Sequence, residues 1–109
     1  MIFADYVQQG DTVDFTPETD LPAGSVVVQG DLVGITKHDI LANRLGSICV
    51  EGVFDINKDL TQAISAGARV YWDATNNQVV TIATGNKLLG KCVQNAPVDT
   101  ATARVRLSQ

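Results

Sequence analysis

Short runs of β-branched and other apolar residues, interrupted every few positions by glycine, asparagine or aspartate, recur along the whole chain. Runs of this length that alternate between apolar and polar side chains are typical of strands joined by tight turns. The pattern predicts strands over residues 12–16, 25–36 (two strands meeting at Gly30 and Asp31), 47–55, 69–73, 78–83, 87–94 and 102–107. We therefore expect a mostly β protein, a compact β-barrel or sandwich of about seven or eight short strands.

One segment between these strands predicts a short α-helix. Asn57 or Asp59 can cap its start, and Gly67 can end it after two turns at most. The apolar face would carry Leu60, Ala63 and Ile64. Residues 37–45 are a weaker helix candidate.

The length of 109 residues is that of one domain. We expect residues 1–109 to form a single β-rich domain, in which residues 1–24 include a partly flexible N-terminal arm and a polar loop with two prolines. Only 18% of the residues are charged, below the usual quarter. A surface with few charges suggests that part of it is covered by another chain.

The charge distribution argues against nucleic-acid binding. The net charge is −4, and the eight basic residues are scattered, with Arg104 and Arg106 as their closest pair. The acidic residues that precede the first basic residue, Lys37, include Asp5, Asp11, Asp14, Glu18 and Asp20. Proteins that bind nucleic acid usually present a basic face to the phosphates, so we expect no direct nucleic-acid partner.

The two cysteines, Cys49 and Cys92, form neither a disulfide framework nor a metal motif. Each has an apolar neighbour, so we expect reduced, buried thiols in a protein made in a cytoplasm. No apolar run approaches the ~18 residues of a membrane span, and the N-terminus lacks the basic and apolar regions of a signal peptide. We expect no membrane partner.

The sequence offers no constellation for catalysis, a metal or a cofactor. The one histidine, His38, has Asp39 beside it, but nothing near it marks a nucleophile, so a solvent-facing side chain in a turn is favoured over a general base. The three Cys and His residues do not have zinc-ligand spacing. Asp11 and Asp14 do not form a calcium loop.

One motif resembles the start of a phosphate-binding P-loop. Residues 85–91 fit G-x-x-x-x-G-K, but the next residue is Cys92, where the motif needs the hydroxyl of serine or threonine to hold magnesium. The following residues are turn-like and predict no helix whose N-terminus could bind phosphate. The two glycines are better explained as interruptions of a strand.

The order of several short motifs resembles a known family. They are residues 6–11 (YVQQGD), 51–55 (EGVFD), 70–73 (VYWD), 84–86 (TGN) leading to Leu89 and Gly90, and 103–107 (ARVRL). Together they are similar to small phage and prophage proteins identified as capsid cement or head decoration proteins. Some members carried the label of a domain of unknown function or of a RecA/RadA-like recombinase. None of the motifs is catalytic, so the resemblance supplies no active site.

The resemblance implies a virion structural protein, made in the bacterial host cytoplasm, that binds the major capsid protein on the outer surface of the head and stabilises it. It implies a homo-oligomer, with a trimer favoured, and no enzyme activity. Candidate interface residues are Phe3, Tyr6, Tyr71, Arg104 and Arg106. Phe3 and Tyr6 could instead pack on an edge strand, and the arginines could simply be solvated. Trp72, which points away from Tyr71, is expected in the core.

Three other functions stay open at this stage. The chain could be an accessory of phage recombination that binds nucleotide or DNA, for which residues 85–91 are the support. It could be another head or tail component, or a β-sandwich that binds a small ligand.

Overall fold

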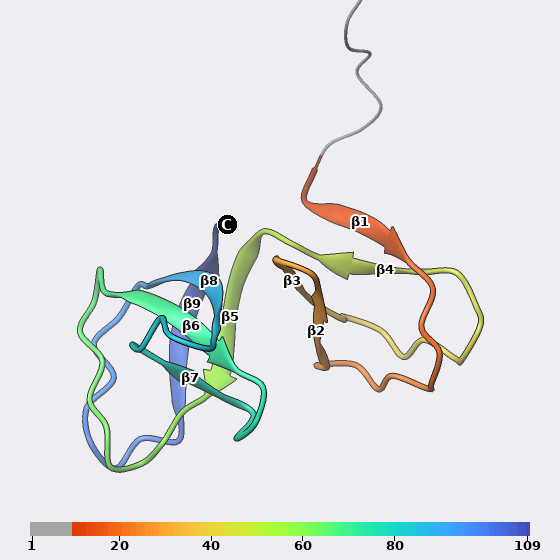
Figure 1. The fold of residues 1–109 in the computed structure, drawn as a ribbon. Helices are drawn as coiled ribbons and strands as arrows, with labels where there is room; N and C mark the ends of the chain where they lie inside the picture. Colours follow the sequence, from red (N-terminus) through yellow and green to blue (C-terminus); the bar gives the residue numbers. More distant parts are fainter. Residues whose placement is uncertain (1–9) are drawn as a thin grey trace, which may run out of the picture.

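The computed structural model describes residues 10–109, and that part of the chain is mostly β, as predicted (Figure 1). Within residues 10–109, nine strands form two antiparallel sheets. The strands are β1 (Thr12–Phe15), β2 (Val26–Gln29), β3 (Leu32–Ile35), β4 (Gly46–Cys49), β5 (Gly52–Asn57), β6 (Arg69–Asp73), β7 (Gln78–Val80), β8 (Lys87–Cys92) and β9 (Thr102–Leu107).

The four-stranded sheet has the order β1-β4-β3-β2. β2 and β3 form a hairpin that turns at Gly30 and Asp31, where the sequence predicted it. β1 pairs with β4 over four positions, but β3 meets β4 at a single pair, Ile35 with Cys49. This sheet is therefore two two-stranded units joined at one point.

The five-stranded sheet has the order β5-β9-β8-β6-β7. Its longest ladder pairs β5 with β9 over six positions, from Gly52 with Leu107 to Asn57 with Thr102. A parallel bridge between Lys58 and Val79 connects the chain just after β5 to β7, so the two edges of this sheet approach each other. The sheet curls around its own apolar face.

The chain passes between the sheets within residues 47–55, which the sequence predicted as one strand. The structure divides this segment into β4 and β5, which belong to different sheets. Gly52 adopts a φ of 125°, a conformation that glycine tolerates and other residues rarely adopt. The apolar alternation continues across the break, so it did not reveal the division.

The predicted helix after Asn57 does not form, and residues 10–109 contain no helix. Lys58 is buried and its Nζ donates to the carbonyls of Asp59 and Gln62, at 2.8 Å and 2.5 Å. Ile64 forms an antiparallel bridge with Ala96, so its backbone is used by a distant segment. Tertiary pairing thus replaces the local helical hydrogen bonds.

The second helix candidate, residues 37–45, is an irregular loop. Ile40 forms a bridge with Leu21, and Asn43 has a φ of 62°, which a helix does not allow. The apolar residues that suggested a helix face are divided, because Ile40 is buried whereas Leu41 and Leu45 are exposed.

The main core lies on the inner face of the five-stranded sheet and is closed by β3. Trp72 is 7% exposed within it, as predicted. Both cysteines are buried and free, also as predicted. The cluster consists of Val33, Ile35, Ile56, Ile64, Val70, Trp72, Val79, Leu89, Cys92, Ala96, Ala103, Val105 and Leu107.

Two polar contacts connect the sheets in addition to this core. The side-chain amide of Gln109 accepts from the backbone N–H of Val33 and donates to its carbonyl, both at 2.7 Å. The Nζ of Lys87 lies 2.8 Å from the carboxylate of Asp31 in the β2–β3 turn. The side chain of Gln109 therefore bonds to the backbone of Val33 on β3 much as a neighbouring strand would.

Candidate interaction surfaces

A row of three basic side chains crosses the outer face of the five-stranded sheet. Arg69 on β6 lies opposite Lys91 on β8, and Lys91 lies opposite Arg106 on β9. All three residues are exposed, and none forms an ion pair with any residue in the range 10–109. We call Arg69, Lys91 and Arg106 the basic row.

A β-bulge makes this row possible. Strict alternation along β8 would put Leu89 and Lys91 on one face, yet Leu89 is fully buried and Lys91 is exposed. The register between β6 and β8 shifts between Val70 and Tyr71, and the extra residue turns Lys91 outward. The period-two pattern alone could not predict this arrangement.

Arg104, the next residue on this face of β9, already has an acidic partner in the same chain. Arg104 lies opposite Asp55 and donates from Nε and from one terminal nitrogen to the two carboxylate oxygens, at 3.0 Å and 3.2 Å. This side-chain hydrogen bond lowers the pKa of Asp55 and raises that of Arg104. Arg104 therefore has a partner, which the sequence did not indicate.

The residue opposite Arg106 on β5 is apolar, whereas the residue opposite Arg104 is an acid. The residue opposite Arg106 on β5 is Val53, which is 56% exposed. The basic row also borders a hollow of about 640 Å³, whose lining includes Leu88 and Val93. The surface thus combines three cations with apolar side chains.

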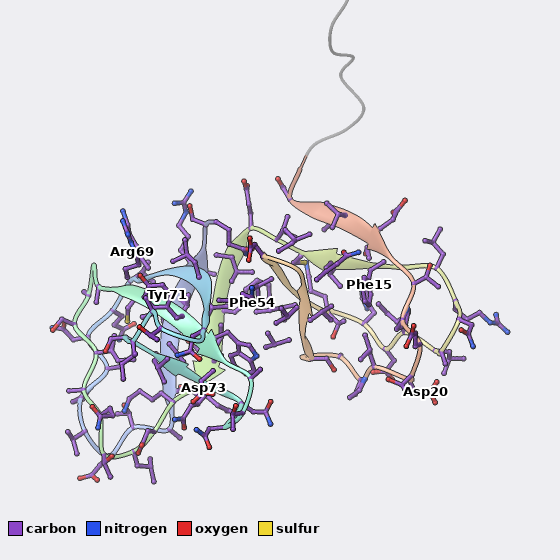
Figure 2. All side chains as sticks on the ribbon, viewed as in Figure 1. Phe15, Asp20, Phe54, Arg69, Tyr71 and Asp73 are labelled. Atoms are coloured by element: carbon purple, nitrogen blue, oxygen red, sulfur yellow. The ribbon has the colours of Figure 1, made fainter. Side chains whose placement is uncertain are left out.

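The aromatic interface candidates have different outcomes. Phe3 and Tyr6 lie outside the described residues. Tyr71 is half-buried on the outer face of β6, opposite Val80 on one side and Leu88 on the other. Figure 2 labels Tyr71 close to Arg69, at one side of the molecule, with Phe15 and Asp20 at the other.

The loop between β3 and β4 presents a second surface. Leu41 and Leu45 are 58% and 72% exposed, and the loop borders a hollow of about 360 Å³. The carboxylate of Asp39 accepts from the backbone N–H of Ala23, which fixes the base of the loop. Exposed apolar side chains that line one hollow make this loop a candidate interaction surface.

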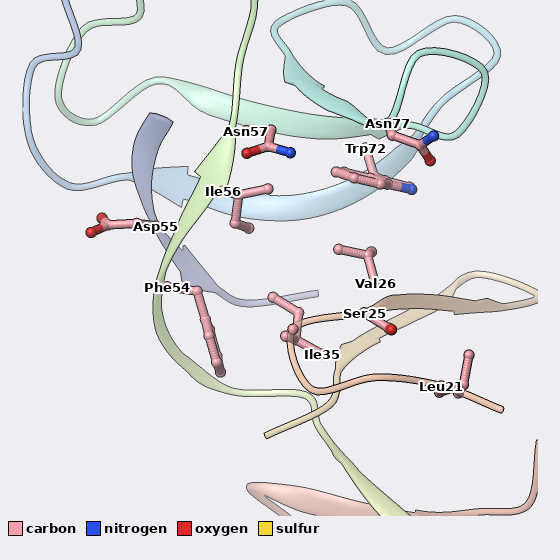
Figure 3. Close-up of a pocket in the computed structure, with 11 residues that line it drawn as sticks. Leu21, Ser25, Val26, Ile35, Phe54, Asp55, Ile56, Asn57, Trp72 and Asn77 are labelled. Atoms are coloured by element: carbon pink, nitrogen blue, oxygen red, sulfur yellow. The ribbon is translucent and has the colours of Figure 1, made fainter. Parts of the chain in front are cut away.

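A cleft of about 480 Å³ lies at the junction of the two sheets (Figure 3). Phe54, Trp72 and Ile35 contribute apolar walls, and asparagine side chains lie at its rim. Within residues 10–109, Asp55 is the one ionisable residue that lines it, and Arg104 already binds that carboxylate. The cleft therefore offers no acid–base pair.

The P-loop-like segment has a different backbone from a phosphate-binding loop. Thr84 and Gly85 form a turn and residues 87–92 are β8, with no helix after them. Gly90 lies inside this strand, beside the register shift, and a Cβ there would lie 2.0 Å from the carbonyl oxygen of Arg106. Gly85 therefore lies in the turn before β8, and Gly90 lies within β8 and does not interrupt it.

Other chemical candidates are dispersed. His38 is exposed in the loop after β3. No three His, Cys, Asp or Glu residues gather as metal ligands in the part of the chain that the structure describes. No helix among those residues could span a membrane.

Lowered pKa values at Asp31, Asp59 and Asp73 arise from hydrogen bonds to Lys87, Thr61 and Asn76.

Comparison with known proteins adds the family. No curated protein and no solved structure matches the chain. A family model described as phage cement protein matches residues 7–107, nearly the whole length. This range contains the motifs that suggested the resemblance, except Tyr6 at the start of the first one. The chain therefore belongs to the phage cement protein family, whose role in the phage capsid is structural.

Proposed function

We propose that this protein binds the outer surface of a phage head through the major capsid protein and stabilises the assembled shell, without catalysing a reaction. The observation that carries the proposal is the family match over residues 7–107. The free, buried cysteines are compatible with synthesis in the cytoplasm of the bacterial host. We further propose that the protein acts as a homo-oligomer, with a trimer favoured.

Stabilisation needs only binding free energy. A protein that binds the assembled shell but not separated subunits favours the shell by mass action. A standard interface buries about 800 Å² per partner, and an oligomer that holds several such contacts together raises their effective concentration. Each copy would bridge neighbouring capsid subunits.

We propose the loop between β3 and β4 as one capsid contact, with Leu41 and Leu45 as its apolar anchors. Their large exposed area is the support, since burying apolar surface is the main favourable contribution to association. Phe3, Tyr6 and Tyr71 remain proposed aromatic contacts. Arg106 is available to an acidic partner, whereas Arg104 would have to exchange Asp55 for a new one.

Co-sedimentation with expanded, undecorated heads tests this proposal. The wild-type chain should bind to saturation, and Leu45→Asp should weaken binding by at least about tenfold because it places a charge in an apolar contact. Ile82→Asp is the matched control, since Ile82 is 64% exposed on another loop. A wild-type chain that does not sediment with heads would refute head binding. If the two variants weaken binding equally, the loop contact is refuted but head binding is not.

A further inference from the structure

The basic row carries an inference about contacts between copies of this chain. Like charges directly opposite each other on a sheet are destabilising, and here three cations occupy neighbouring positions on three adjacent strands. The chain has a net charge of −4, so this concentration of positive charge is not a consequence of composition.

The contrast with Arg104 shows what the basic row lacks. Asp55 neutralises Arg104 from the opposite position on β5, and Val53 occupies the equivalent position opposite Arg106. Glu51, which precedes β5, forms no ion pair with Arg106 or with any other residue in the described range. None of these residues of β5 or next to it supplies an acid to the basic row, so an acidic partner has to come from elsewhere.

The other sheet carries the complementary charge. Between residues 10 and 36 the chain has five acids and no basic residue. Asp31 binds Lys87, and Asp20 accepts from the backbone N–H of Ala42. Asp14 on β1 and Glu18 just after it are exposed, and neither forms an ion pair within residues 10–109. We call Asp14 and Glu18 the acidic edge.

The basic row and the acidic edge lie on different sheets. Figure 2 shows Arg69 on one side of the molecule and Phe15, which follows Asp14 on β1, on the other. The two surfaces therefore do not neutralise each other within one copy.

We propose that the basic row of one copy binds the acidic edge of a second copy in a head-to-tail contact. Such a contact uses two different surfaces, so it leaves one of each unoccupied and closes into a ring if the rotation allows. Val53, Leu88 and Val93 would add apolar contact beside the charges. The inference deepens the oligomer part of the proposed function, and it can be tested without heads.

Sedimentation velocity of the full chain at low and high salt is the first test. We expect concentration-dependent association at low ionic strength that weakens in 1 M salt, where the screening length falls to about 3 Å. Lys91→Glu and Asp14→Lys should each weaken association at least about tenfold. Lys37→Glu makes the same charge change at an exposed position outside the row and should leave association unchanged.

Charge exchange is the second test. Lys91→Glu and Asp14→Lys should each self-associate more weakly than the wild type. An equimolar mixture should recover association, because the unaltered row of one variant can bind the unaltered edge of the other and the two reversed residues can also pair. Val53→Glu should also weaken association, since it supplies Arg106 with a partner on its own sheet, as Asp55 does for Arg104. Circular dichroism should show that all these variants remain folded.

Three results would overturn the inference. One is a wild-type chain that stays monomeric at every concentration and salt. The second is association that neither reversal alters. The third is tight binding of a short DNA duplex that depends on Lys91 while self-association does not, which would assign the row to a nucleic acid. Any of these can occur while head binding is intact, so this inference and the proposed function fail separately.

Discussion

The two sheets of this protein differ in how their strands are held together. In the five-stranded sheet, β9 pairs with β5 over six positions and with β8 over three, and the main core lies against this sheet. In the four-stranded sheet, β3 and β4 meet at one pair, and this sheet contributes Val33 and Ile35 to the main core, with Val26 packed against it. The comparison suggests a rigid body joined to a more adaptable part.

This difference matches the proposed surfaces. The four-stranded part carries the exposed Leu41 and Leu45 and the acidic edge, whereas the five-stranded sheet carries the basic row. A cement protein needs both a rigid body and a surface that can fit another molecule. The predictions below test whether the two parts have these separate roles.

Gly90→Ala should have the largest effect on folding. A Cβ at Gly90 would lie 2.0 Å from the backbone oxygen of Arg106, and its φ of 155° is rarely adopted by other residues. We expect a loss of at least about 3 kcal/mol in unfolding free energy, measured by urea denaturation.

Gly34→Ala in the other sheet is the matched control for Gly90→Ala. The added Cβ would come within 2.5 Å of the Cδ1 of Ile48, 2.8 Å of its Cγ1 and 2.9 Å of its Cβ, so the contact is with a side chain and not with the backbone. We expect a cost of about 1–3 kcal/mol. A Gly34→Ala variant that is the less stable of the two would contradict the assignment of rigidity to the five-stranded sheet.

Leu89→Ala and Ile48→Ala compare fully buried side chains in the two sheets. Each removal should cost about 2–5 kcal/mol through lost burial and a residual cavity. Hydrogen exchange should separate them. Leu89→Ala should accelerate exchange in both sheets, whereas Ile48→Ala should accelerate it mainly in β1 and β4. Identical exchange profiles for the two variants would indicate one cooperative unit.

Gln109→Ala should weaken the connection between the sheets. It removes both hydrogen bonds to the buried backbone of Val33, and unsatisfied buried groups cost about 1–3 kcal/mol. Ser108→Ala, at the neighbouring exposed position, should be within about 0.5 kcal/mol of wild type. Thermal denaturation of both variants measures the difference, and equal midpoints would show that the amide contributes nothing.

The Asp55–Arg104 pair should have the smallest effect. The pKa of Asp55 is lowered in the folded chain, so the pair contributes stability above the unfolded pKa of about 3.9 and loses it as the pH falls through the lower folded value. Arg104→Gln should return the pKa of Asp55 toward its ordinary value in an NMR titration. An unchanged pKa in that variant would show that Arg104 is not its cause.

The sequence predicted the elements whose pattern is local. β9 alternates without interruption, and β6 and β7 lie within the predicted strands 69–73 and 78–83. The sequence did not predict that Val50 and Glu51 divide one alternating run between two sheets. It also predicted a helix near Asp59 that bridges from Lys58 and Ile64 prevent. Those outcomes depend on distant partners.

The candidate surfaces show the same limit. Arg106 and Tyr71 were identified as interface candidates from residue type, and both lie on the outer face of the five-stranded sheet. Arg69 and Lys91 were missed because the basic row depends on strand order and on the bulge at Gly90, neither of which a single sequence reveals. The pairing of Arg104 with Asp55 across 49 positions was hidden for the same reason.

The central claim is that binding alone stabilises the shell. Calorimetry of expanded heads at increasing concentrations of the wild-type chain, without nucleotide, tests this claim directly. We expect the melting temperature of the heads to rise with occupancy and to keep rising with the logarithm of the free protein concentration. Heads that are saturated with the protein and melt at the same temperature as bare heads would contradict it.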